Sequence, residues 1–166
     1  FKIVKLCGPN ITDDSLKLLE KSENLESLDL CSCSIDGSGL KYIADKIKVD
    51  TLNFDSVPIT DDGIKHVKDL VNITNIVLNK TKITDNGLSY LVNLKKLRRL
   101  SLYGTNITDK SIPYIIDMMG NKQNQYDTYL IIYKTKISRN GVKKLLDAGI
   151  KVNCDYKDLS SEIPWD

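Results

Sequence analysis

The sequence is short of the residues from which active sites are built. Its 166 residues include one histidine, one tryptophan and two phenylalanines. An enzyme needs a constellation of acid, base or nucleophile, and His66 stands apart from any such set, so we expect it to be an exposed surface residue. The repeated acidic residues have a simpler interpretation, given below. The sequence therefore predicts a protein that is not an enzyme and that uses no metal or cofactor.

Long apolar runs are also missing. No stretch of about 20 apolar residues is present, so the sequence predicts no membrane span. It shows no signal peptide, and we expect a cytoplasmic protein, with the cell surface or secretion left open. The first strand begins at Phe1 without the polar cap that a terminal repeat normally carries. This predicts a piece of a longer protein.

Neither sign of charge dominates the chain, with 24 Lys and Arg against 22 Asp and Glu. This balance argues against a dedicated nucleic-acid binder. Residues 1–75 hold 9 basic and 13 acidic side chains (net −4), and residues 76–166 hold 15 and 9 (net +6). Such an asymmetry can orient a partner, but drift in the composition of solvated helix faces would produce the same numbers. The basic run from Lys95 to Arg99 is interpreted as a solvated connection, with contact to a phosphate or an acidic partner as the alternative.

What the sequence does contain is a repeat. Six isoleucines mark it, with four successive spacings of 24 residues and a fifth of 30. The six extra residues fall naturally at Gly120–Gln125. The marker positions are Ile11, Ile35, Ile59, Ile83, Ile107 and Ile137.

The apolar pattern within each unit is constant. Apolar residues seven and five positions before each marker, such as Leu100 and Leu102, indicate a strand with one buried face. Those five and eight positions after it, such as Leu88 and Leu91, share one face of a helix. Each unit thus predicts a strand, a turn and a helix of about ten residues. The expected strands are Phe1–Cys7, Ser27–Leu30, Thr51–Phe54, Asn75–Leu78, Arg99–Leu102, Tyr129–Ile132 and Ile150–Asn153. The expected helices are Asp14–Lys21, Ser38–Ile47, Asp61–Leu70, Asp85–Leu94, Asp109–Met119 and Arg139–Ala148.

The sequence pattern of the repeat unit resembles that of a known family. The pattern L-x-x-L-x-L-x-x-(T/C)-x-I-T-D-x-G-L is similar to the leucine-rich repeat, in particular to the 24-residue class of bacterial and F-box-associated, cysteine-containing proteins. The resemblance covers 1–153 as six units plus a final strand. It implies an α/β fold, a right-handed solenoid with a parallel sheet of about seven strands on the concave side and helices on the convex side. Residues 154–166 would then form a C-terminal cap or tail, with Trp165 able to cover the last helix.

Two features of the repeat have structural interpretations. The recurring Thr-Asp pairs, for example Thr84-Asp85, are interpreted as helix caps. The family usually has Asn, Cys or Thr two residues before the marker, hydrogen-bonded along the stack. Cys33, Thr81, Thr105 and Thr135 fit this pattern. Pro9 and Val57 do not, which predicts an interrupted ladder in the N-terminal half.

The cysteines fit neither a disulfide framework nor a zinc site. Cys7, Cys31, Cys33 and Cys154 lack framework spacing, and Cys31-x-Cys33 has no second pair to complete a zinc site. We expect free thiols. Cys7 and Cys31 are nevertheless 24 residues apart, in one column of adjacent strands about 5 Å apart, and could be bridged in an oxidising compartment.

The outward strand positions are where a partner could be recognised, because folding does not dictate their identity. Tyr and Arg, which dominate interface hot spots, gather in the C-terminal half. We predict a partner-binding site at Asn79, Arg99, Ser101, Tyr103, Tyr129, Ile131 and Tyr133. Alternatively, the tyrosines pack on each other or against residues 120–126.

The sequence therefore predicts a protein–protein interaction module that binds a protein or peptide on its concave face, with no small-molecule substrate. The family resemblance adds an alternative, the substrate-recognition domain of an F-box-type ubiquitin-ligase receptor whose adaptor-binding segment is absent from this chain. A third possibility is the appended repeat domain of an enzyme. A nucleic-acid role would require salt-dependent binding through residues such as Arg98, Lys80 and Lys134.

Overall fold

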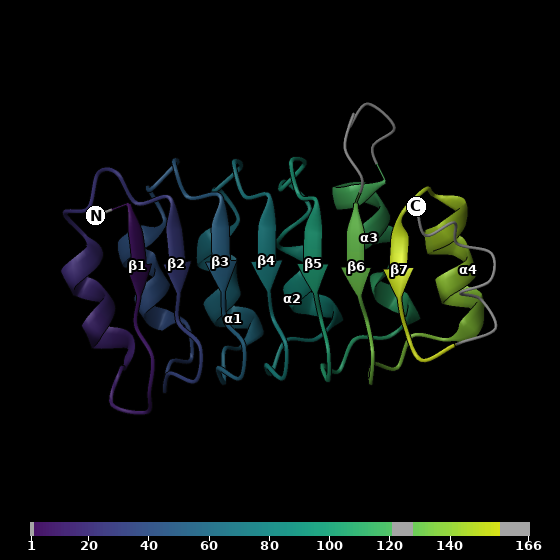
Figure 1. The fold of residues 1–166 in the computed structure, drawn as a ribbon, viewed down its shortest axis with the longest axis horizontal. Coiled ribbons are helices and arrows are strands. Elements are labelled where there is room, and N and C mark those ends of the chain that lie inside the picture. Colours follow the sequence, from purple (N-terminus) through teal and green to yellow (C-terminus); the bar gives the residue numbers. More distant parts are fainter. Residues whose placement is uncertain (1, 121–127, 157–166) are drawn as a thin grey trace.

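The computed structural model describes residues 2–120 and 128–156. Seven strands lie side by side in one parallel sheet, in chain order, with all arrows pointing the same way (Figure 1). Paired residues in neighbouring strands among the first five are one repeat of 24 residues apart, so that Ser27 pairs with Thr51 and Thr51 pairs with Asn75. The strands are β1 (Ile3–Lys5), β2 (Ser27–Asp29), β3 (Thr51–Asn53), β4 (Asn75–Val77), β5 (Arg99–Ser101), β6 (Tyr129–Ile131) and β7 (Lys151–Asn153).

Each strand is shorter than predicted, but its hydrogen bonding continues. Leu30 N–H donates to the Asn53 carbonyl at 2.9 Å, and Leu78 N–H donates to the Ser101 carbonyl at 2.8 Å. The predicted strand ends therefore still join neighbouring units, although the backbone is already leaving extended geometry.

The helices line the opposite side of the sheet (Figure 1). The prediction of ten-residue helices is confirmed in the fifth and sixth units and is wrong in the other four, which use shorter or 3-10 segments. A 3-10 helix rises about 2.0 Å per residue against about 1.5 Å for an α-helix, so fewer residues cover the return path of a 24-residue unit. The segments are η1 (Asp13–Leu19), η2 (Ser38–Ile43), α1 (Asp61–Ile64), η3 (Lys65–Val67), α2 (Asp85–Ser89), η4 (Asp109–Ser111), α3 (Ile112–Met119) and α4 (Arg139–Asp147). Residues 121–127, where most of the predicted insertion falls, and 157–166, which include Trp165, lie outside the described residues.

The core is one continuous apolar column between the sheet and the helices. Leu52, Phe54, Ile59 and Ile64 show how one unit fills it, since all four are fully buried. Each such side chain contributes about 1.5 to 3 kcal/mol when removed from water. In the first unit the equivalent residues Val4, Leu6 and Ile11 are only half-buried.

The threonines before the markers do not form the expected ladder. The Thr81 and Thr105 hydroxyls donate to the Leu78 and Leu102 carbonyls at 2.8 and 2.7 Å, within their own units. Only the Cys33 thiol, among the described fitting residues, reaches a neighbouring unit, at the Leu6 carbonyl (3.1 Å). These side chains therefore close the turn of one unit and do not tie a stack together.

The Thr-Asp pairs tie the stack instead. Thr84 caps α2 by accepting from Asn86 N–H, as predicted. Its own N–H and hydroxyl also donate to the Asp61 carboxylate of the preceding unit, at 2.8 and 2.5 Å. We call this arrangement the inter-repeat clasp. It recurs between Asp85 and Thr108 and between Asp109 and Ser138.

The clasp requires space beside the helix start. A Cβ on Gly87 would meet the Asp61 carboxylate and lie 2.9 Å from Ile83 Cγ2. In the fifth unit Ser111 stands at this position and its hydroxyl donates to the Asp85 carboxylate. Gly87 and Gly141 are therefore packing residues that lie against the aspartate carboxylate of the preceding unit, whereas the fifth unit has a serine at this position that bonds to the aspartate.

Among the described junctions, the one between the second and third units lacks a carboxylate acceptor. In the second unit Asp36 occupies the threonine position and Gly37 the aspartate position. Thr60 accordingly donates its N–H and hydroxyl to the main-chain carbonyl of Asp36, at 3.0 and 3.3 Å. This junction still closes, but without a charged acceptor.

We predict that Asp85→Ala lowers the free energy of unfolding by about 1 to 3 kcal/mol, because two hydroxyls and one N–H lose their acceptor. Urea denaturation measures the change. The matched control is Asp62→Ala, since Asp62 is exposed and pairs only at the surface with Lys65, and such pairs contribute about 0 to 1 kcal/mol. Equal losses in both variants would contradict the assigned role of Asp85.

The clasp also predicts a pH dependence. Burial opposes ionisation of Asp85, but hydrogen bonds from Ser111 and Thr108 outweigh it and lower the pKa of this carboxyl. A lowered folded-state pKa stabilises the protein above the unfolded value of about 3.9, and the contribution disappears as pH falls through the folded value. The stability difference between wild type and Asp85→Ala should therefore shrink between pH 7 and pH 3. A difference that stays constant or grows on acidification would contradict this.

Candidate interaction surface on the sheet face

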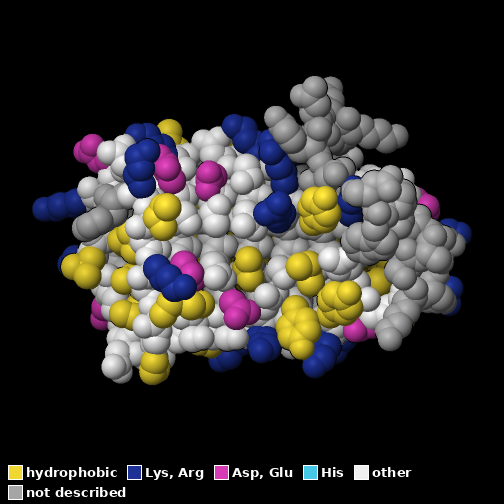
Figure 2. All heavy atoms as spheres, viewed as in Figure 1, with side chains coloured by type: hydrophobic (Ala, Val, Ile, Leu, Met, Phe, Trp, Pro, Cys, Tyr) yellow, Lys and Arg dark blue, Asp and Glu magenta, His cyan; other side chains and the backbone are white. Residues whose placement is uncertain are grey.

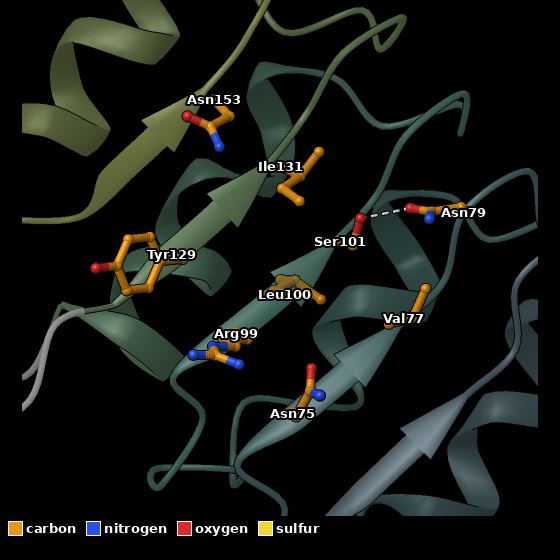
Figure 3. A pocket seen from close by; sticks show the side chains of 9 residues that line it. All are labelled: Asn75, Val77, Asn79, Arg99, Leu100, Ser101, Tyr129, Ile131 and Asn153. Atoms are coloured by element: carbon orange, nitrogen blue, oxygen red, sulfur yellow. Dashed lines mark hydrogen bonds between the residues drawn. The ribbon is translucent and has the colours of Figure 1, made fainter. Parts of the chain in front are cut away.

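The sheet register gathers the outward side chains of β4 to β7 around one shallow hollow. It has a volume of about 470 Å³. Figure 3 shows its lining side chains arranged in rows across neighbouring strands. One row begins with Asn75, Arg99 and Tyr129, and the next with Val77, Ser101 and Ile131, as the strand pairing requires. The lining residues are Asn75, Val77, Asn79, Arg99, Leu100, Ser101, Tyr129, Ile131 and Asn153.

One end of the hollow is held by Asn79. Its side-chain oxygen accepts from the Ser101 hydroxyl at 2.5 Å and from Tyr103 N–H at 3.1 Å. Figure 3 shows the Asn79–Ser101 bond joining the ends of neighbouring strands. Ser101 is only 8% exposed, so it supports the surface and offers little contact area of its own.

The other end is aromatic and basic. Arg99 is exposed and Tyr129 is half-buried, and both come from the first positions of their strands. The Lys151 ammonium lies 5.6 Å from the centre of the Tyr129 ring, which is within cation–π range. Figure 2 shows hydrophobic and basic side chains together over β5 and β6.

Tyr103 and Tyr133 lie on the same face but beyond the residues that line the hollow. The Tyr103 ring has the ammonium groups of Lys80 and Lys134 at 5.8 and 5.4 Å from its centre. Hydrogen bonding to Tyr103 raises the pKa of Lys134. Tyr133 is 38% exposed. Tyr103 therefore contacts lysines and is not part of a purely aromatic cluster. The alternative in which the tyrosines pack against residues 120–126 involves residues 121–127, which lie outside the described residues.

The N-terminal half of the face differs in chemistry. Lys5 and Asp29 form an ion pair at 3.4 Å. The Asn53 side-chain amide donates to the same carboxylate at 2.9 Å, and so does Cys31 N–H at 3.1 Å. These polar groups satisfy one another within the sheet.

Five of the seven predicted site residues therefore meet at the hollow, namely Asn79, Arg99, Ser101, Tyr129 and Ile131. The prediction missed Asn75, Val77, Asn153 and the buried Leu100. Asn75 and Val77 occupy outward positions of their strands, but the prediction favoured tyrosine and arginine and so left them out.

Two observations concern other functions. His66 follows the start of η3 and is half-buried, so the expectation of an exposed side chain is wrong. In the part of the chain that the structure describes, no helix combines the length and apolar character needed to cross a bilayer.

We predict that Asn79→Ala destabilises the fold by about 1 to 2 kcal/mol, because Ser101 and Tyr103 lose a shared acceptor. Asn75→Ala is the control, since Asn75 lines the same hollow but takes no part in the hydrogen bonds of Asn79 with Ser101 and Tyr103. Thermal unfolding of both variants measures the difference. Equal melting temperatures would show that Asn79 does not organise this end of the hollow.

Comparisons with known proteins agree with this architecture. The family described as Leucine Rich repeat matches residues 21–44, and no curated protein matches the sequence. An internalin (inlF) from Listeria monocytogenes superposes with a TM-score of 0.67 at 20% identity, covering 84% of this chain and 37% of that chain. Internalin C2 (inlC2) from the same organism gives a TM-score of 0.50 at 19% identity, covering 92% of this chain and 80% of that chain.

The chain thus spans little more than a third of the first of these proteins. The similarity concerns the fold alone. The chain therefore has the leucine-rich repeat fold, and one of its units matches the family model.

Proposed function

We propose that this protein is a non-catalytic interaction module that binds a protein or peptide across β4 to β7. The observation that carries the proposal is the hollow, where Arg99, Tyr129 and Ile131 converge on the sheet face. Leucine-rich repeat domains typically bind proteins, and a solenoid presents an extended surface for this purpose.

The chemistry of the hollow suits a polypeptide. Ile131 and Val77 provide apolar area in its middle, while Asn75 and Asn153 place amide groups at its margins. Interfaces combine an apolar centre with a polar rim in this way. Tyrosine and arginine add large contact areas with hydrogen-bonding tips.

The charge of this half favours a partner that presents carboxylates. Residues 76–166 carry a net charge of +6. Arg99, Lys80 and Lys134 are exposed on or beside the sheet face. Complementary charge speeds association and selects partners more than it raises affinity, so the apolar and aromatic residues would supply most of the binding energy.

Two finer predictions remain open to experiment. The role in an F-box-type receptor stays an alternative, which no contact in the described residues favours over general protein binding. A cytoplasmic location likewise stays a prediction. The sequence of the full-length gene product would show whether it contains the adaptor-binding segment that the receptor role requires.

A polypeptide bound across β4 to β7 would extend beyond the hollow over Tyr103 and Tyr133 on the same face, so we predict that Tyr103→Ala combined with Tyr133→Ala weakens partner binding by more than about 2 kcal/mol, or about thirty-fold. An affinity pull-down with wild type and variant identifies the partner by mass spectrometry. Titration calorimetry with the purified partner then measures both affinities.

The control is Tyr90→Ala, which matches Tyr133 in residue type and exposure, at 40% against 38%, but follows α2 on the helix side. Binding should be unchanged in this variant. If the Tyr103/Tyr133 variant folds and binds as tightly as wild type, while Tyr90→Ala binds weakly, the partner uses the helix side and the proposal is wrong.

A further inference from the structure

A second group of reactive side chains lies at the opposite end of the sheet. Cys7 and Cys31 follow β1 and β2 and continue the register in which Lys5 pairs with Asp29. Their Sγ atoms are 2.8 Å apart and share a hydrogen bond. Cys7 is exposed and Cys31 is half-buried. One strand, β3, separates this pair from the strands of the proposed partner site, so this group has to be explained separately.

The backbone already has the spacing that a disulfide needs. Neighbouring strands lie about 4.8 Å apart, and disulfides form between residues whose Cα atoms are about 4.4 to 6.8 Å apart. The two sulfurs exceed the S–S bond length of about 2.05 Å by less than about 1 Å. Side-chain rotation would therefore close the bond without displacement of either strand.

The other two cysteines do not compete for this partner. Cys33 is buried, and its thiol donates to the Leu6 carbonyl at 3.1 Å. Cys154 follows β7 at the far end of the sheet. Geometry thus selects one pair from four cysteines.

A metal ion is the rival occupant, because the Asp29 carboxylate lies beside the two thiols. That carboxylate already faces the Lys5 ammonium at 3.4 Å and accepts from Asn53 and Cys31. Zn–S bonds of about 2.3 Å in tetrahedral geometry place two sulfurs about 3.8 Å apart. The observed sulfurs are too close for a shared ion, and a cation would have to displace Lys5.

We propose that Cys7 and Cys31 form a disulfide under oxidising conditions and lock the first repeat onto the second. The oxidant is a low-molecular-weight disulfide such as glutathione disulfide. The Cys7 thiolate attacks one of its sulfurs, forming a mixed disulfide and releasing one thiolate. The Cys31 thiolate then attacks the Cys7 sulfur and releases the second. Two protein thiols are oxidised, the small disulfide is reduced to two thiols, and the two protein protons pass to them.

The order of the steps follows from the environment. Hydrogen bonding with Cys7, together with burial and the Asp29 charge, raises the pKa of Cys31 to about 12. Cys31 therefore stays a thiol at neutral pH while the pair is intact, and the exposed Cys7 meets the oxidant first. Once Cys7 carries the mixed disulfide, the thiol hydrogen bond is gone and Cys31 ionises more readily.

The disulfide would act on the unit with the weakest packing. It encloses η1 and joins β1 to β2, where Val4 and Leu6 are only half-buried. In a reducing compartment, such as the predicted cytoplasm, the pair stays as thiols. Exposure to an oxidant would then form the disulfide, which would prevent local opening of the first repeat.

The test treats the reduced full chain with glutathione disulfide. We expect a mass decrease of about 2 Da from loss of two hydrogens, and a peptide map that links Cys7 to Cys31. Hydrogen exchange at Ile3–Lys5 should slow at least about tenfold on oxidation, because local opening of this edge is restricted. Cys7→Ser and Cys31→Ser should abolish both effects, whereas Cys154→Ser should behave as wild type.

Three outcomes would overturn the proposal. One is a peptide map that shows a different cysteine pair. Another is a glutathione adduct that persists on Cys7 in the wild type. The third is stoichiometric binding of Zn²⁺ to the reduced protein that Cys7→Ser removes, because the thiols would then form a metal site.

Discussion

The whole structure depends on one constraint, the equal register of neighbouring units. A strand exposes alternate residues on opposite faces, so a shift of one residue would exchange buried and outward positions. With a stride of 24 residues, Leu28, Leu52 and Ile76 fall in one buried column, and Ser27, Thr51 and Asn75 fall in one outward column. The core and the sheet face are two consequences of the same register.

Apolar packing alone would allow some slippage between similar units, and the inter-repeat clasp opposes it. An aspartate from one unit accepts two hydrogen bonds from the threonine or serine of the next, as at Asp61 and Thr84. Charged acceptors make stronger and shorter hydrogen bonds than neutral ones. The bond is directional, so it fixes the register between neighbouring units at the starts of their helices. The leucines supply most of the buried apolar area. The second junction, where Asp36 offers only its carbonyl, relies more on packing.

The sequence was sufficient to predict the repeat, the parallel sheet and the buried columns, because these depend on periodicity. Helix length was not predictable in the same way. It depends on the distance that the chain must cover from the end of one strand to the start of the next, and the spacing of Leu88 and Leu91 does not give that distance. The aspartates were interpreted as helix caps because capping acts within one unit, whereas the bond from Thr84 to Asp61 appears only when units are stacked. The hollow was partly predicted from Arg99 and Tyr129, but Asn75 and Asn153 gain their importance from neighbours in space.

The most direct test of this account is a measurement of the register in solution by NMR couplings across hydrogen bonds. We expect a coupling between the Leu78 amide and the Ser101 carbonyl, and another between the Leu102 amide and the Ile131 carbonyl. These pairs fix β4 to β5 and β5 to β6, the strands that build the hollow. Couplings displaced by one residue would place Arg99 and Tyr129 on the buried side and contradict both the core and the proposed interaction surface.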